Sequence, residues 1–119
     1  MARNEDGFTL VEMLAVMVVM AILVAIAIGF NTSARVRAAD AAAKSNIDVA
    51  VPAFQAYALD NGTYTGMTIT YLQSTYSPGI QGFHVLAADT SSYCVVSTVE
   101  GRSWYKHGPG AAITTTACP

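Results

Sequence analysis

The sequence predicts an α+β protein: one long N-terminal α-helix, transmembrane in its first half and amphipathic in its second, packed on a small antiparallel β-sheet. Three observations predict this. The stretch Phe8–Phe30 is apolar apart from glycine and two polar residues. Apolar residues then recur every three or four positions as far as Ala58. After Gly62 the chain is rich in residues that favour strands, with turn residues between them.

The first expected element is a transmembrane helix over residues 8–30. About 20 helical residues span the hydrocarbon core of a bilayer, so this stretch is long enough. Its polar residues are Thr9 and Glu12. A charge at the bilayer centre costs about 3 kcal/mol, which makes Glu12 a functional candidate that needs a partner. The alternative is that Glu12 lies one turn from the helix start and extends to the lipid headgroups.

The second expected element is an amphipathic continuation of the same helix over residues 31–60. Its apolar face consists of Val36, Ala39, Ala43, Ile47, Ala50, Phe54 and Ala58. On the polar face, Asp40–Lys44 and Lys44–Asp48 are opposite charges four residues apart, and each pair is expected to add a few tenths of a kcal/mol. These residues alone are also typical of an ordinary helix on a small sheet.

Two residues are expected to kink the helix, and a third to end it. Gly29 softens it, Pro52 removes a backbone donor, and Gly62 can take the left-handed conformation that stops a helix. At about 1.5 Å per residue the helix from Phe8 to Leu59 would be about 78 Å long. No small globular domain buries that length, so most of it must contact other molecules.

Residues 61–119 are expected to form an antiparallel sheet head with a C-terminal disulfide segment. The strands are expected at Phe83–Ala88, Tyr93–Val99 and Ser103–His107, with a short one at Met67–Leu72. Residues 89–92 and 100–102 are expected to form the turns of a meander.

The only two cysteines, Cys94 and Cys118, are expected to form a disulfide. They are too far apart for a Cys-x-x-Cys redox or zinc pattern, and only two histidines exist to complete a metal site. The bridge would stabilise this small head by roughly 3–4 kcal/mol and imply an oxidising compartment. The alternative is a pair of free buried thiols.

The sequence contains no recognisable catalytic set. No acid or nucleophile stands at a spacing from His84 or His107 that would indicate a catalytic site. The sequence also has no phosphate-binding glycine loop and no zinc-binding spacing. The formal net charge of −2, without a basic cluster, predicts no direct binding to nucleic acid. We therefore expect a protein that is not an enzyme and needs no metal or other cofactor.

The start of the chain resembles the N-terminus of type IV pilins and pseudopilins, the prepilin-type N-terminal methylation motif. The resemblance rests on Met1–Gly7 followed by Phe8-Thr9-Leu10-Val11-Glu12. It implies that residues 1–7 are a leader, that prepilin peptidase cleaves between Gly7 and Phe8, and that Phe8 is N-methylated. It also implies that Glu12 is the assembly residue. We expect Thr9, a second assembly residue, to add a hydrogen bond to the packing of the helices in the filament.

The resemblance implies a structural subunit, the major pilin of a type IV pilus-like surface filament. The precursor would be a single-pass protein of the cytoplasmic membrane, in contact with lipid. After cleavage it would join a homo-oligomeric helical filament outside the cell, with the help of membrane assembly machinery. Arg35 and Arg37, just beyond the apolar stretch, argue weakly for the opposite orientation, but the cleavage motif outweighs them.

The alternative within the family is a pseudopilin of a type II secretion or DNA-uptake (competence) machine. The pair Cys94 and Cys118 favours the pilin, whereas the turn Asn61-Gly62-Thr63-Tyr64 suits both. Some major pseudopilins bind calcium, but Asp89 and Glu100 are the only carboxylates in the C-terminal half. A third hypothesis, a binding module anchored by one span, does not explain the glycine–phenylalanine junction.

Overall fold

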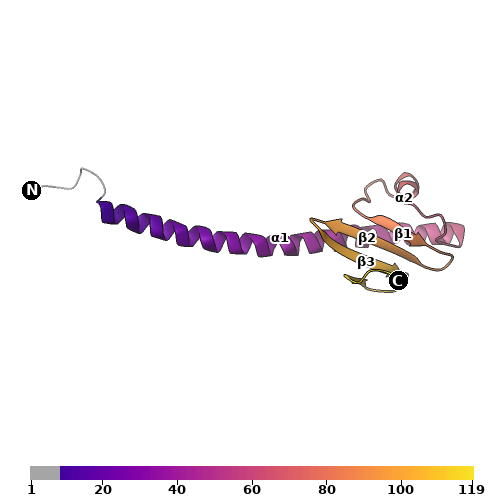
Figure 1. Ribbon diagram of the computed structural model, residues 1–119. Helices are drawn as coiled ribbons and strands as arrows, with labels where there is room; N and C mark the ends of the chain where they lie inside the picture. The colour runs from indigo at the N-terminus through magenta and orange to yellow at the C-terminus, as the bar shows by residue number, and fades with distance from the viewer. Residues whose placement is uncertain (1–8) are drawn as a thin grey trace, which may run out of the picture. The chain divides into compact units, whose positions relative to one another are not determined.

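The structure is a computed structural model that describes residues 9–119. Its elements, labelled in Figure 1, are α1 (Leu10–Asn61), α2 (Ile69–Thr75), β1 (His84–Ala88), β2 (Tyr93–Val99), β3 (Arg102–Gly108) and β4 (Ile113–Thr114). The predicted α+β fold, a long helix with a small antiparallel sheet, is confirmed. The chain divides into two compact units, the first ending at Arg35 and the second running from Val36 to Pro119.

Helix α1 has 52 residues and ends two residues after the predicted Leu59. The backbone N–H of Gly62 donates to the carbonyl oxygen of Ala58 at 2.7 Å, and Gly62 has φ of 72°. This is the left-handed cap for which glycine has no steric penalty. The helix continues through Gly29 and Pro52, so neither ends it. The kinks expected at these two residues stay predictions.

The first unit contains the apolar half of α1, and its described side chains are all exposed. Its large apolar side chains range from 48 % exposed at Met13 to 87 % at Leu10. By length and composition α1 can cross a membrane, and none of its most apolar stretch is buried within the protein. These side chains therefore need lipid or other chains around them.

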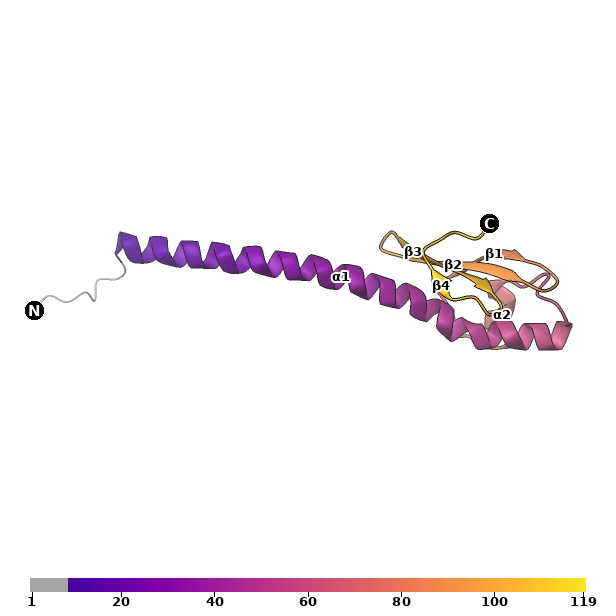
Figure 2. The same cartoon turned by 90° about the horizontal axis from the view of Figure 1, so that it is seen from below.

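The second unit packs the rest of α1 against the sheet, as Figures 1 and 2 show. The helical spacing correctly predicted Ile47, Ala50 and Phe54 as α1 residues of the core. It missed Ala53 and Tyr57, which also lie in the core, and the predicted Val36 is 39 % exposed. The ring centroid of Phe54 lies 5.5 Å from that of Phe83 and 4.9 Å from that of Tyr93. These aromatic contacts join α1 to the strands.

The sheet is a four-stranded antiparallel meander in the order β1-β2-β3-β4. The pairing of β1 with β2 shifts register between Val85 and Ala87. Residues 93–97 of β2 are all buried, although alternate side chains of a strand point to opposite faces. Tyr93 and Val95 pack in the core, whereas Cys94 is bonded to Cys118. The C-terminal segment therefore covers the face of β2 that α1 does not.

The strand predicted at Met67–Leu72 is wrong, because helix α2 begins within it. Thr68 is the N-cap, with extended backbone, and its side-chain oxygen accepts from the backbone N–H of Tyr71 at 3.2 Å. The alternating threonines suggested a strand, but one of them is a helix cap. The prediction of β2 is confirmed, those of β1 and β3 differ by one residue at their ends, and β4 was missed.

Candidate functional site

The start of α1 is held by two reciprocal hydrogen bonds between Thr9 and Glu12. The backbone N–H of Thr9 donates to Oε2 of Glu12 at 3.3 Å, and the backbone N–H of Glu12 donates to Oγ1 of Thr9 at 3.2 Å. This is a capping box, in which two residues satisfy backbone donors that a helix start leaves unpaired. A carboxylate in the first turn also interacts favourably with the helix dipole. The chain itself thus sets the position of this carboxylate.

The threonine and glutamate stand at the spacing of a capping box in the sequence, Thr-x-x-Glu, yet sequence reasoning missed the reciprocal bonds. It grouped Thr9 and Glu12 only as assembly residues. Gly7 and Phe8, the predicted cleavage and methylation residues, lie outside the described residues. Of the four residues predicted for this site, the structure therefore describes Thr9 and Glu12.

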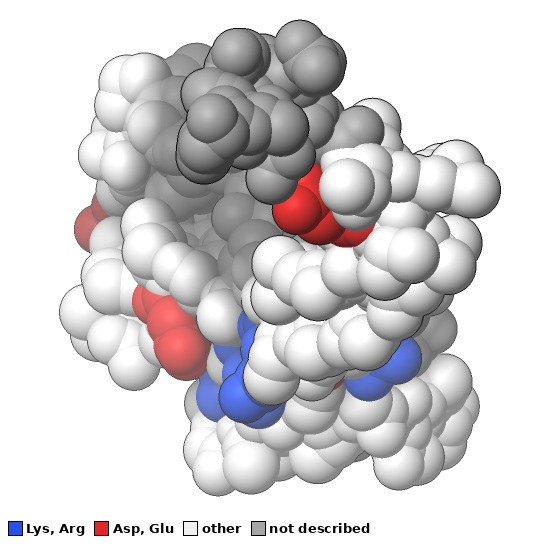
Figure 3. Space-filling view, turned by 90° about the vertical axis from the view of Figure 1, so that its left-hand side faces the viewer, with Lys and Arg blue, Asp and Glu red and all other residues white. Residues whose placement is uncertain are grey.

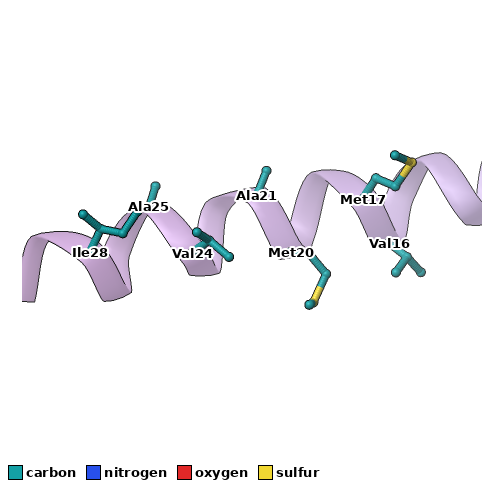
Figure 4. A pocket seen from close by; sticks show the side chains of 7 residues that line it. All are labelled: Val16, Met17, Met20, Ala21, Val24, Ala25 and Ile28. Carbon is teal, nitrogen blue, oxygen red and sulfur yellow. The ribbon is translucent and has the colours of Figure 1, made fainter. Parts of the chain in front are cut away.

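Beyond the capping box, α1 presents a shallow apolar hollow. Its lining residues, shown in Figure 4, are Val16, Met17, Met20, Ala21, Val24, Ala25 and Ile28. Small residues let helix backbones approach closely, and methionine adapts to irregular partners. This surface can receive apolar side chains from another helix or from lipid.

The predicted disulfide is present, with the Cα atoms of Cys94 and Cys118 6.2 Å apart. Neither cysteine is free. Because Cys94 lies near the start of β2, the bridge ties the C-terminal segment to a central strand of the sheet.

A polar cluster that the sequence did not predict joins α1 to β3. The carboxylate of Asp40 accepts hydrogen bonds from the guanidinium of Arg102 and from Nε1–H of Trp104. The Lys44 Nζ lies 4.1 Å from the centroid of the Trp104 ring. Hydrogen bonds from Arg102 and Trp104 hold the pKa of Asp40 below its usual value, and the charge of Lys44 adds a smaller effect. The bonded partners of Asp40 thus come from the sheet, and not from Lys44 as predicted.

The charges of the described chain are of mixed sign. Figure 3 shows basic and acidic side chains interspersed on a mostly uncharged face. Among the described residues, His, Cys, Asp and Glu form no group of three that could hold a metal ion.

Comparison with known proteins identifies the family. The family model described as the prokaryotic N-terminal methylation motif matches residues 2–28. The chain is also 32 % identical, over 117 residues, to the type IV wide pilus major component PilA4 of Thermus thermophilus. That alignment covers 96 % of this chain and 89 % of the relative, and so includes both the helix and the sheet. This chain belongs to the type IV pilin family.

Proposed function

We propose that this chain is the major pilin, the repeating structural subunit of a type IV pilus, and not an enzyme. The observation that carries the proposal is the exposed apolar half of α1, with a single carboxylate held at its start. Such a surface is stable only in lipid or against other apolar helices. A filament of identical helices supplies the second environment.

Before assembly, residues 8–30 hold the precursor in the cytoplasmic membrane with the second unit outside. Prepilin peptidase cleaves between Gly7 and Phe8, and the new terminal amine on Phe8 is methylated. The methylation-motif match, which spans this junction, supports this sequence of events. The disulfide agrees with an oxidising compartment for the second unit.

In the filament, Glu12 of one subunit meets the Phe8 amine of a neighbour. Each charge then offsets the cost of burying the other, and the pair sets the register of the subunits more than it adds strength. The strength comes from packing of apolar side chains, including those of the hollow around Met20 and Ala21. Thr9 supports the site by capping the same helix.

A secretion or DNA-uptake pseudopilin shares the first unit with a pilin. The relative that is similar along nearly the whole chain is a pilus component, and this favours the pilin. Electron microscopy of material sheared from the cell surface separates the two: a major pilin appears as long fibres of this chain.

The test of the assembly role is Glu12→Gln. Glutamine keeps the shape and can still close a capping box, but it cannot pair with an amine. We expect processed, membrane-resident subunits and a fall in filament yield of at least about tenfold, because removing one partner of a buried ion pair costs about 3 kcal/mol or more. Filaments are quantified after shearing, and intact mass of the membrane fraction verifies cleavage before Phe8.

Asp48→Asn is the matched control, since it removes an exposed carboxylate from the same helix. Its filament yield should equal that of the wild type. A normal yield from Glu12→Gln would overturn the role proposed for Glu12.

A further inference from the structure

The donors around Asp40 form a geometry that recognises carboxylates. The Nε–H of Arg102 donates to Oδ1 of Asp40, and Nη2–H donates to Oδ2 at 3.1 Å. The Nε1–H of Trp104 donates to Oδ1 at 2.9 Å. A planar guanidinium that bonds both oxygens is the arrangement by which arginine binds carboxylates specifically, and the indole N–H adds a third directed donor.

Lys44 adds a second positive charge near the carboxylate of Asp40. Its ammonium lies over the ring of Trp104, a favourable cation–π arrangement that also holds the indole in place. The groups that act on Asp40 are therefore Arg102 and Trp104 from β3 and Lys44 from α1. The pKa of Asp40 is lowered, mainly by the hydrogen bond from Arg102, in agreement with a site built for the anionic form.

This polar cluster lies at the edge of the apolar core, against which the partly buried Trp104 packs. The first α1 residue of the core cluster is Ile47, after both Asp40 and Lys44 in the chain. Arg102 is the first residue of β3 and follows the turn at Glu100 and Gly101. The side chains of Arg102 and Asp40 are 44 % and 20 % exposed, so small solutes can reach the cluster from solvent.

We propose that Arg102, Trp104 and Lys44 form a carboxylate-binding site that Asp40 of the same chain occupies, and that this occupancy fastens the start of β3 to α1. The inference is independent of the filament and of Glu12. Its consequence is that removal of the Asp40 carboxylate leaves a vacant receptor that a free carboxylate can fill.

The experiment uses the full chain in detergent micelles, with formate as the probe. Trp104 is the only tryptophan, so the tryptophan fluorescence comes from a side chain of this site. Asp40→Ala should shift the emission of Trp104, and formate should return it to the wild-type position with a saturable dependence on concentration. Chloride at equal ionic strength should not. Wild type and the control Asp48→Ala should not respond to formate.

Amide hydrogen exchange supplies the second readout. In Asp40→Ala the amides of residues 99–103, around the turn between β2 and β3, should exchange about tenfold faster than in the wild type. The reason is that the hydrogen bonds from Arg102 and Trp104 to Asp40, which hold this turn against α1, are lost. Formate should restore their protection, while Val95 in the core should exchange at an unchanged rate.

A folded Asp40→Ala chain whose emission ignores formate would overturn the binding site. Unchanged exchange at residues 99–103 would overturn the fastening. Should Asp40→Ala fail to fold, Asp40→Asn serves instead: it keeps the side-chain shape and loses the charge. It must accelerate the same amides, and equal protection in Asp40→Asn and the wild type would refute the proposal.

Discussion

At the scale of single residues, the second unit contains a buried hydroxyl that both donates and accepts a hydrogen bond. Ser97 is completely buried, and its Oγ donates to the carbonyl oxygen of Gly82 at 2.6 Å. The Nδ2 of Asn46 donates to Oγ of Ser97 at 3.1 Å and to the same carbonyl at 3.3 Å. The group links α1, β2 and the loop before β1, and it avoids the cost of an unpaired buried polar atom.

Glycine is required at position 82 for two reasons: its positive φ and the closeness of the Asn46 amide. A pair of variants separates the two. Gly82 and Gly101 have nearly the same positive φ, 79° and 78°. A Cβ on Gly82 would overlap the amide of Asn46, whereas one on Gly101 would meet nothing. Gly101→Ala should cost about 1–2 kcal/mol from the backbone alone. Gly82→Ala should cost more, as measured by denaturant unfolding; equal costs would show that the Asn46 amide moves aside freely.

Tyr93 makes the second unit sensitive to alkali. Burial raises the pKa of Tyr93 from 10.0 to about 12. The unfolded chain therefore loses this proton first, and the stabilisation present below pH 10 is lost as pH rises from 10 toward 12. Tyr93→Phe should unfold less readily in that pH window than the wild type does. Unfolding midpoints measured across the window test this, and parallel curves for the two chains would contradict it.

At the scale of elements, the local sequence pattern correctly predicts the helix α1 but wrongly predicts a strand where α2 lies. The helical spacing predicts the residues from Ala39 to Phe54 that are buried, apart from Ala53, because one continuous face must pack against the sheet. In α2, Thr68 and Thr70 alternate as in a strand, yet Thr68 caps the helix and Leu72 enters the core. Seven residues are too few for periodicity to choose between the two structures.

The cap of α2 can be tested by threonine substitution. Thr68→Ala removes the acceptor of the Tyr71 N–H and should cost about 1 kcal/mol, measured by denaturant unfolding. Thr68→Ser keeps a capping hydroxyl and should cost little. Thr70→Ala, at an exposed position of the same helix, is the control. A loss at Thr70 as large as that at Thr68 would show that the effect comes from elsewhere than the cap.

At the scale of the whole molecule, the two units differ in whether their apolar side chains are buried within the protein. The second unit has its own buried core, and a disulfide bonds its C-terminal segment to β2. The first unit buries none of its most apolar stretch. A chain with such a first unit is stable only within a membrane or an assembly, as expected for a pilin.

The disulfide is expected to contribute to the second unit as a whole. It closes a loop with a sequence separation of 24, so removal through Cys94→Ala with Cys118→Ala should cost roughly 3–4 kcal/mol in the chain-entropy model. Denaturant unfolding of the oxidised wild type and the double variant measures the loss. Reduced wild type is the control for the changed side chains. Unfolding of the double variant at the wild-type midpoint would rule out this contribution.

The sequence by itself determined the features that depend on neighbouring residues: the apolar stretch, the face of α1, the strand β2 and the motif around Phe8 and Glu12. These signals are local, because a helical or strand period repeats over a few residues. The pairing of the two cysteines was also predictable, since only one pair exists.

Only the tertiary structure decided which distant side chains meet. Asp40 lies 62 residues before Arg102, and Asn46 lies 51 before Ser97. No spacing rule connects such positions, because the approach of α1 to the sheet sets these distances. Within the helix, Lys44 was the natural partner of Asp40. The sheet offered a guanidinium that bonds both oxygens, and directed hydrogen bonds of this kind are stronger than an exposed pair of charges.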